Sequence, residues 1–152
     1  MRSIDQPSVK RQLLHRISLL HPNLMPRWGK MNAPQMLAHL NDSFISVMGD
    51  KLVPIDPNFR FRAIVKWFAL YMPTHWPHDV PTVPEIDQQR HGTPPGDFEA
   101  DRQMLLAAVE RFTRLPREFI FRPHPMFLEL TERQWMRWGW LHTDHHLRQF
   151  GL

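Results

Sequence analysis

Apolar side chains recur every three or four residues in five segments of the chain, as expected for helices that each bury one face. In the second segment, for example, Met36, Leu37, Leu40 and Phe44 form one stripe. Leu, Met, Ala, Arg and Gln dominate these segments, and such residues favour helix over strand. We therefore predict an all-α fold, with helices over residues 9–20, 32–48, 59–71, 97–115 and 131–150.

The second and fifth segments have well-defined starts. Asn32 is followed three residues later by Gln35, and Thr131 by Gln134. Both pairs fit a capping box, in which each partner's side chain bonds to the other's backbone N–H. We expect these two helices to begin at these residues.

Residues 73–96 interrupt the helical pattern with many prolines and three histidines, His75, His78 and His91. Loops of this length without secondary structure are uncommon in compact domains and are often functional. The segment is either a proline-stiffened wrap over the surface or a lid over a site.

The length of 152 residues predicts a single domain, 1–152, that buries about 69% of its unfolded surface. The net charge of +4 comes from scattered residues, without the basic stripe of a nucleic-acid-binding protein. Neither a secretory signal nor an apolar run of membrane-spanning length is present. We expect a cytoplasmic protein that binds neither nucleic acid nor membrane.

The chain has ten histidines and no cysteine. The absence of cysteine excludes disulfides, thiolate metal sites and a cysteine nucleophile. A transition-metal site would have to use imidazole, with carboxylates as the other available ligands.

His142 and His146 lie four residues apart in the last predicted helix, so they differ by about 40° around its axis. Both project from the apolar face that carries Trp135, and His145 lies nearer the rim. Two inward imidazoles on one face suit a shared metal ion. The alternative is a pair of core histidines that hydrogen-bond to other polar groups.

A third ligand must come from another helix, and His39 is the best candidate. It lies about 120° from the centre of the apolar stripe of its helix. This flank position suits a residue that faces a groove between helices, and it equally suits a surface histidine.

Two stretches resemble the signatures of the DinB/YfiT-like superfamily, specifically an uncharacterised subfamily of it. The first is WGKMNAPQMLAHL over residues 28–40. The second is HPMFLELT over 124–131, followed by Trp135 and by HTDHHLRQFG over 142–151. The resemblance extends from about Ser8 to the end of the chain.

The resemblance implies an antiparallel four-helix bundle with a long proline-rich crossover loop, and a homodimer. It also implies one divalent metal ion held by His39, His142 and His146. Characterised relatives include metal-dependent transferases that join a low-molecular-weight thiol to an electrophile, and a thiol-requiring maleylpyruvate isomerase. Despite the DinB name, the resemblance implies no role on DNA.

Three histidine ligands leave a coordination position open, as in catalytic zinc sites. Zinc and nickel both suit imidazole. The first functional hypothesis is a metal-dependent transferase that joins a low-molecular-weight thiol to a small electrophilic substrate. The alternatives are a metal-dependent hydrolase, which lacks an adjacent glutamate as base, and a non-enzymatic metal- or small-molecule-binding bundle.

Several nearby residues have expected supporting roles. A ligating histidine usually donates its second N–H to an oxygen, and Asp42 and Gln149 are the candidates. Asp144 is expected to be a surface charge. His124 is expected in the turn before the last helix, in a structural role or lining the site. On that helix, Trp140 and Leu147 fall on the outward side, which suggests a dimer face.

Overall fold

The computed structural model describes residues 1–56 and 60–152. These residues form five α-helices and no β-strand, which confirms the all-α prediction. The helices are α1 (Pro7–Ser18), α2 (Ala33–Met48), α3 (Arg62–Tyr71), α4 (Phe98–Thr113) and α5 (Glu132–Gln149).

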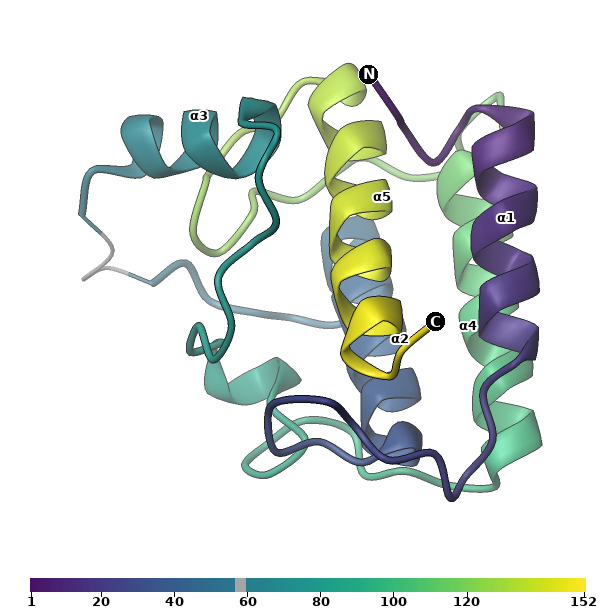
Figure 1. The fold of residues 1–152 in the computed structure, drawn as a ribbon. Coiled ribbons are helices and arrows are strands. Elements are labelled where there is room, and N and C mark those ends of the chain that lie inside the picture. The colour runs from purple at the N-terminus through teal and green to yellow at the C-terminus, as the bar shows by residue number, and fades with distance from the viewer. Residues whose placement is uncertain (57–59) are drawn as a thin grey trace.

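The axes of four helices, α1, α2, α4 and α5, lie roughly parallel, with α1 and α5 running in the opposite direction to α2 and α4 (Figure 1). Helix α3 lies across them beside the first half of α5. The most extensive contact is between α2 and α4. A long connection leads from α3 to α4 and contains a short 3-10 helix, η1 (Pro84–Ile86), which packs against α2.

The helix ends follow the local sequence closely. Both capping boxes are present: the Asn32 side chain accepts a hydrogen bond from the Gln35 N–H (2.9 Å), and the Thr131 hydroxyl accepts one from the Gln134 N–H (3.3 Å). Helix α1 begins two residues earlier than predicted because Pro7 occupies its first turn, where a missing N–H costs little. The predicted start of the third helix, residue 59, lies outside the described residues.

An aromatic cluster packs α2, α4 and α5 together. The ring of Phe44 lies 4.9 Å from that of Phe112 and 5.8 Å from that of Trp138, measured between centroids. Gly139 makes room for this packing, because a Cβ there would lie 3.0 Å from the Phe112 ring and 3.1 Å from Ile4. The cluster forms a rigid base on one side of the helices that carry the histidines of interest.

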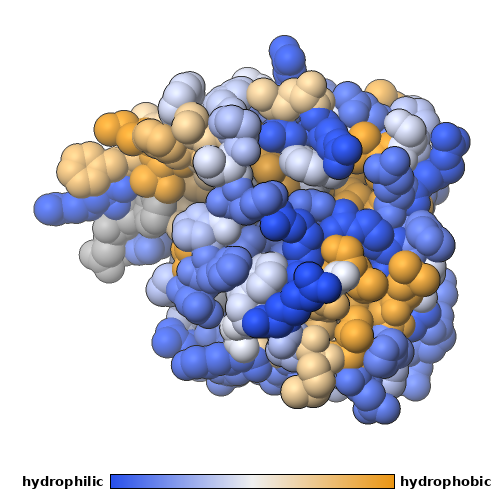
Figure 2. All heavy atoms as spheres, in the orientation of Figure 1, coloured by the Kyte–Doolittle hydropathy of each residue, from blue (hydrophilic) through white to orange (hydrophobic). Residues whose placement is uncertain are grey.

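One expectation about the surface is wrong. Leu147, assigned to an outward face of the last helix, is fully buried within this chain. The wheel gave its direction but not its burial, because α1 also packs against α5. Hydrophobic residues instead gather over α3 (Figure 2), where the exposed large side chains are Phe61, Ile64, Trp67, Phe68 and Tyr71. In the described residues, we find no helix with the length and apolarity needed to cross a bilayer.

Candidate metal centre

The structure brings His39, His142 and His146 together between α2 and α5. The Nε2 atom of His142 lies 3.3 Å from Nε2 of His39 and 3.2 Å from Nε2 of His146. One ligand atom from each residue lies within 4.8 Å of the others, and all three side chains are buried. These are the three histidines singled out from the sequence.

The spacing of these nitrogens fits a tetrahedral metal. Zinc–imidazole bonds are about 2.0–2.1 Å long, which places two nitrogens of one tetrahedral site about 3.3 Å apart. The two measured nitrogen separations match this value. The donor set and these separations therefore suit one divalent ion.

Hydrogen bonds at the far side of two rings determine which nitrogens carry protons. The Nδ1 atom of His39 lies 2.7 Å from the carbonyl oxygen of Ile86, which can only accept. The Nδ1 atom of His146 lies 3.0 Å from Oε1 of Gln149, and the Gln149 amide is oriented by its own bond to the Trp28 carbonyl (2.8 Å). Both Nδ1 atoms therefore donate, and both Nε2 atoms present a lone pair to the centre.

The hydrogen bond from the Gln149 amide to the Trp28 carbonyl requires the backbone at Gly29 to lie close to the Gln149 side chain. Gly29 has a φ of +78°, and a Cβ there would lie 2.4 Å from Nε2 of Gln149. Glycine removes both the steric conflict and the backbone strain. It thereby allows Gln149 to reach the Trp28 carbonyl and to orient His146.

His142 is held differently. Its Nδ1 atom is buried and has no hydrogen-bond partner among the described residues. The ring instead packs against Trp138 (5.0 Å between centroids) and Trp76 (6.0 Å). Aromatic packing, rather than a hydrogen bond, orients the central histidine of the three.

Burial lowers the pKa of all three imidazoles below the ordinary value, and it is the largest cause in each case. For His142 and His146, the neighbouring imidazoles lower the pKa further, because a second positive charge would be repelled. The three rings are therefore neutral near pH 7, which is the form that binds metals.

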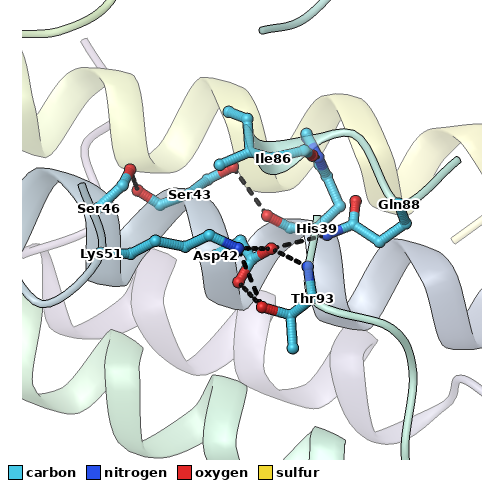
Figure 3. Close-up of polar contacts among 8 residues, drawn as sticks. All are labelled: His39, Asp42, Ser43, Ser46, Lys51, Ile86, Gln88 and Thr93. Carbon is cyan, nitrogen blue, oxygen red and sulfur yellow. Dashed lines mark hydrogen bonds and ion pairs between the residues drawn. The ribbon is translucent and has the colours of Figure 1, made fainter. Parts of the chain in front are cut away.

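Asp42 supports His39 indirectly, and the expected direct hydrogen bond is absent. Its buried carboxylate accepts from the ammonium of Lys51 (2.6 Å), the amide of Gln88 (2.9 Å), and both the N–H and hydroxyl of Thr93 (2.8 and 2.7 Å) (Figure 3). These bonds hold residues 88–93 against α2. Ile86, whose carbonyl orients His39, lies two residues before this segment.

A cavity of about 820 Å³ opens over the three imidazoles. Part of the 73–96 segment, including Trp76, Val83 and Ile86, lines it, so this segment is a wall of the site. Trp28 and Trp76 were not identified from the sequence, although Trp28 begins the first signature. The contribution of Ile86 is a backbone oxygen, for which no sequence pattern exists.

The remaining predicted neighbours take separate positions. His145 is half-buried and lies beside Trp76 and His78, at centroid distances of 5.9 and 6.5 Å. Asp144 is partly buried and forms an ion pair with Arg16 (2.6 Å). His124 is buried in the turn before α5, and it also lines the cavity.

These buried histidines predict that acid destabilises the metal-free protein. Burial lowers the pKa of His124 from 6.5 to about 3, so below pH 6.5 the unfolded chain binds a proton that the folded chain excludes. Stability is therefore full above pH 6.5 and falls as the pH drops towards 3. We expect His124 alone to cost about 2 kcal/mol between pH 7.5 and 5, with the three clustered histidines acting in the same direction.

Urea unfolding with a chelator present, at pH 7.5 and 5, measures this effect. In the His124→Asn variant, the difference in unfolding free energy between the two pH values should be smaller by about 2 kcal/mol. Equal unfolding free energies at the two pH values in the wild-type protein would contradict the prediction.

Comparison with known proteins gives one family. A family model described as DUF1569, protein of unknown function, matches residues 2–151. No curated protein and no solved structure matches the chain.

Proposed function

The chain belongs to the DUF1569 family, and we propose that it is a metal-dependent transferase that joins a low-molecular-weight thiol to a small electrophile. One divalent ion, zinc or nickel, would be held by His39, His142 and His146. The convergence of three buried Nε2 atoms carries this proposal: the Nε2 atom of His142 lies 3.2–3.3 Å from those of the other two, and the Nε2 atoms of His39 and His146 present lone pairs to the centre.

The site suits a catalytic ion better than a structural one. Structural zinc is usually enclosed by four protein ligands, whereas three ligands below a cavity leave a position for a substrate. When bound, the ion would lower the pKa of a thiol and favour its nucleophilic thiolate form near neutral pH.

The chain's own residues support thiol transfer over hydrolysis. It contains no cysteine, so any thiol must enter as a substrate. The histidine group includes no carboxylate among the described residues. Hydrolysis commonly uses a general base beside the bound water, whereas attack by a thiolate needs no such base. A non-enzymatic metal-binding bundle is the second candidate, because the same cluster suits it equally.

We also propose that the fold is the DinB/YfiT-like four-helix bundle. Helices α1, α2, α4 and α5 would be its four helices, and the proline-rich residues 73–96 would be part of the long crossover from α2 to α4. The roughly parallel axes of these four helices, with α1 and α5 opposite in direction to α2 and α4, support this assignment (Figure 1). The expected homodimer stays a prediction, and sedimentation analysis would test it.

The function is tested by incubating zinc- or nickel-loaded protein with a panel of low-molecular-weight thiols and chlorodinitrobenzene. The thiolate displaces chloride, and the coloured thioether reports the rate. We expect a rate well above that of metal-free protein and of the His39→Ala variant. Stoichiometric metal with no such rate for any thiol would overturn the transferase and support the binding bundle.

A further inference from the structure

A tight turn before α5 fixes the protonation of one histidine outside the metal cluster. Two backbone hydrogen bonds of 2.9 Å, from the His124 N–H to the Leu128 carbonyl and back, close the turn. Inside it, Nδ1 of His124 accepts from the N–H groups of Met126 (3.1 Å) and Phe127 (3.2 Å). A nitrogen that accepts hydrogen bonds carries no proton, so the proton of this neutral ring is on Nε2.

Packing holds the His124 ring in one orientation. The ring stacks on Phe127 at 4.4 Å with an interplanar angle of 14°, and it meets Trp138 edge-on at 5.6 Å. Burial also disfavours the charged form of the ring. His124 is therefore a neutral imidazole whose Nε2–H has a fixed direction.

The cavity is where this N–H can find an acceptor. His124 lines the same cavity as His142, the central member of the metal cluster. Its Nε2 atom has no hydrogen-bond partner in the part of the chain that the structure describes. A donor held rigidly beside a ligand-sized cavity is pre-organised for an oxygen atom that arrives with a ligand.

We propose that the Nε2–H of His124 donates a hydrogen bond to a carbonyl-type oxygen of a largely apolar, aromatic ligand bound in this cavity. The inference rests on the proposed function for the identity of the ligand as substrate. The proposed hydrogen bond does not require a bound metal, because the contacts that orient the His124 ring all come from the protein.

The apolar character of the ligand follows from the cavity wall. Val65, Phe68, Trp76, Met126 and Trp138 all contribute to it. The aromatic members, Phe68, Trp76 and Trp138, can stack on flat apolar molecules.

Three polar side chains of the wall already hydrogen-bond to the backbone. The Trp76 indole N–H donates to the Ala69 carbonyl (2.8 Å), and the Ser43 and Ser46 hydroxyls donate to backbone oxygens (2.8 and 2.9 Å). The Nδ1 atom of His142 also has no partner in the described ranges, but it is buried. The N–H of His124 is therefore the donor that we assign to a ligand.

The donor also fits the chemistry proposed for the site. A hydrogen bond to a carbonyl oxygen withdraws electron density and stabilises negative charge that develops there during nucleophilic attack. His124 would therefore both orient an electrophilic substrate and select one that carries an oxygen acceptor.

Binding of a matched pair of probes to metal-free protein tests the proposal. 2-Acetylnaphthalene carries the carbonyl, whereas 2-ethylnaphthalene has nearly the same shape without an acceptor. Quenching of tryptophan fluorescence reports binding, because Trp28, Trp76 and Trp138 line the cavity. We expect the ketone to bind about five- to tenfold more tightly than the hydrocarbon, as one hydrogen bond allows.

Two substitutions separate the two ring nitrogens. In His124→Asn, the side-chain oxygen can replace Nδ1 inside the turn, but the distal N–H is lost. We expect this variant to lose the preference for the ketone. In His124→Gln, the amide can place an N–H near the position of Nε2 without the turn acceptor, so the preference should persist in a less stable protein.

Two results of the binding experiment would contradict the proposed role of His124. A wild-type protein that binds both probes equally, or a His124→Asn variant that keeps the preference, would overturn the proposal. Nitrogen-15 NMR of the imidazole gives an independent check that needs no variant, since a proton on Nδ1 at pH 7 would also refute it. If the preference is found but no metal binds, the proposed function fails while this inference stands.

Discussion

Replacing His39 or His146 with alanine is expected to abolish stoichiometric zinc or nickel binding. Each substitution removes one of three converging nitrogens and leaves only two protein ligands. Loss of a hydrogen-bonded partner of a ligand already costs 10- to 100-fold in metal affinity, so loss of the ligand itself should exceed 100-fold. Metal analysis of purified protein, followed by competition with a chromophoric chelator, measures the change.

His145→Ala provides a matched control. It removes the imidazole directly before His146 in the chain, and this imidazole is not part of the three-histidine cluster. It should retain one equivalent of metal. Gln149→Leu should weaken binding by an intermediate 10- to 100-fold, because it removes the acceptor that orients His146. Full metal content in both His39→Ala and His146→Ala would exclude the three-histidine site.

Replacing Asp42 with alanine is expected to destabilise the protein by about 3–5 kcal/mol. The buried carboxylate accepts from Lys51, Gln88 and both donors of Thr93, and its removal leaves these groups without that acceptor. The free energy of unfolding in urea measures the effect. We also expect weaker metal binding, because residues 86–93 would no longer be held where the Ile86 carbonyl orients His39.

A second aspartate gives the control for this prediction. Asp50 forms an ion pair with Arg111 at the surface, and its side chain is 44% exposed. Surface pairs typically contribute at most about 1 kcal/mol, so Asp50→Ala should have a small effect. Comparable losses for the two variants would mean that the Asp42 network is not a special source of stability.

Local sequence signals predicted the helices well. The periodic apolar stripes located all five, and the Asn32–Gln35 and Thr131–Gln134 capping boxes placed two starts correctly. The pairing of His142 with His146 also follows from local geometry, because residues four apart on a helix share a face. All of these features depend on neighbours within one or two helical turns.

Contacts between distant segments required the structure. A helical wheel gives the direction of Leu147 relative to Trp135, but it does not reveal that this side of α5 is also buried. Asp42 was assigned to His39 because it is near in sequence. Its actual partners are Lys51, nine residues away, and residues 88 and 93, which are 46 and 51 residues away and come close only in the fold.

The sequence by itself determined that the chain is helical, that it must use imidazole for any transition-metal site, and that two imidazoles share one helix face. Only the tertiary structure decided that His39 meets them at metal-binding distance and that a backbone carbonyl at Ile86 orients it. The physical reason is that helix formation follows local preferences of consecutive residues. Hydrogen bonds to backbone oxygens, by contrast, are available to every residue type and leave no trace in the sequence.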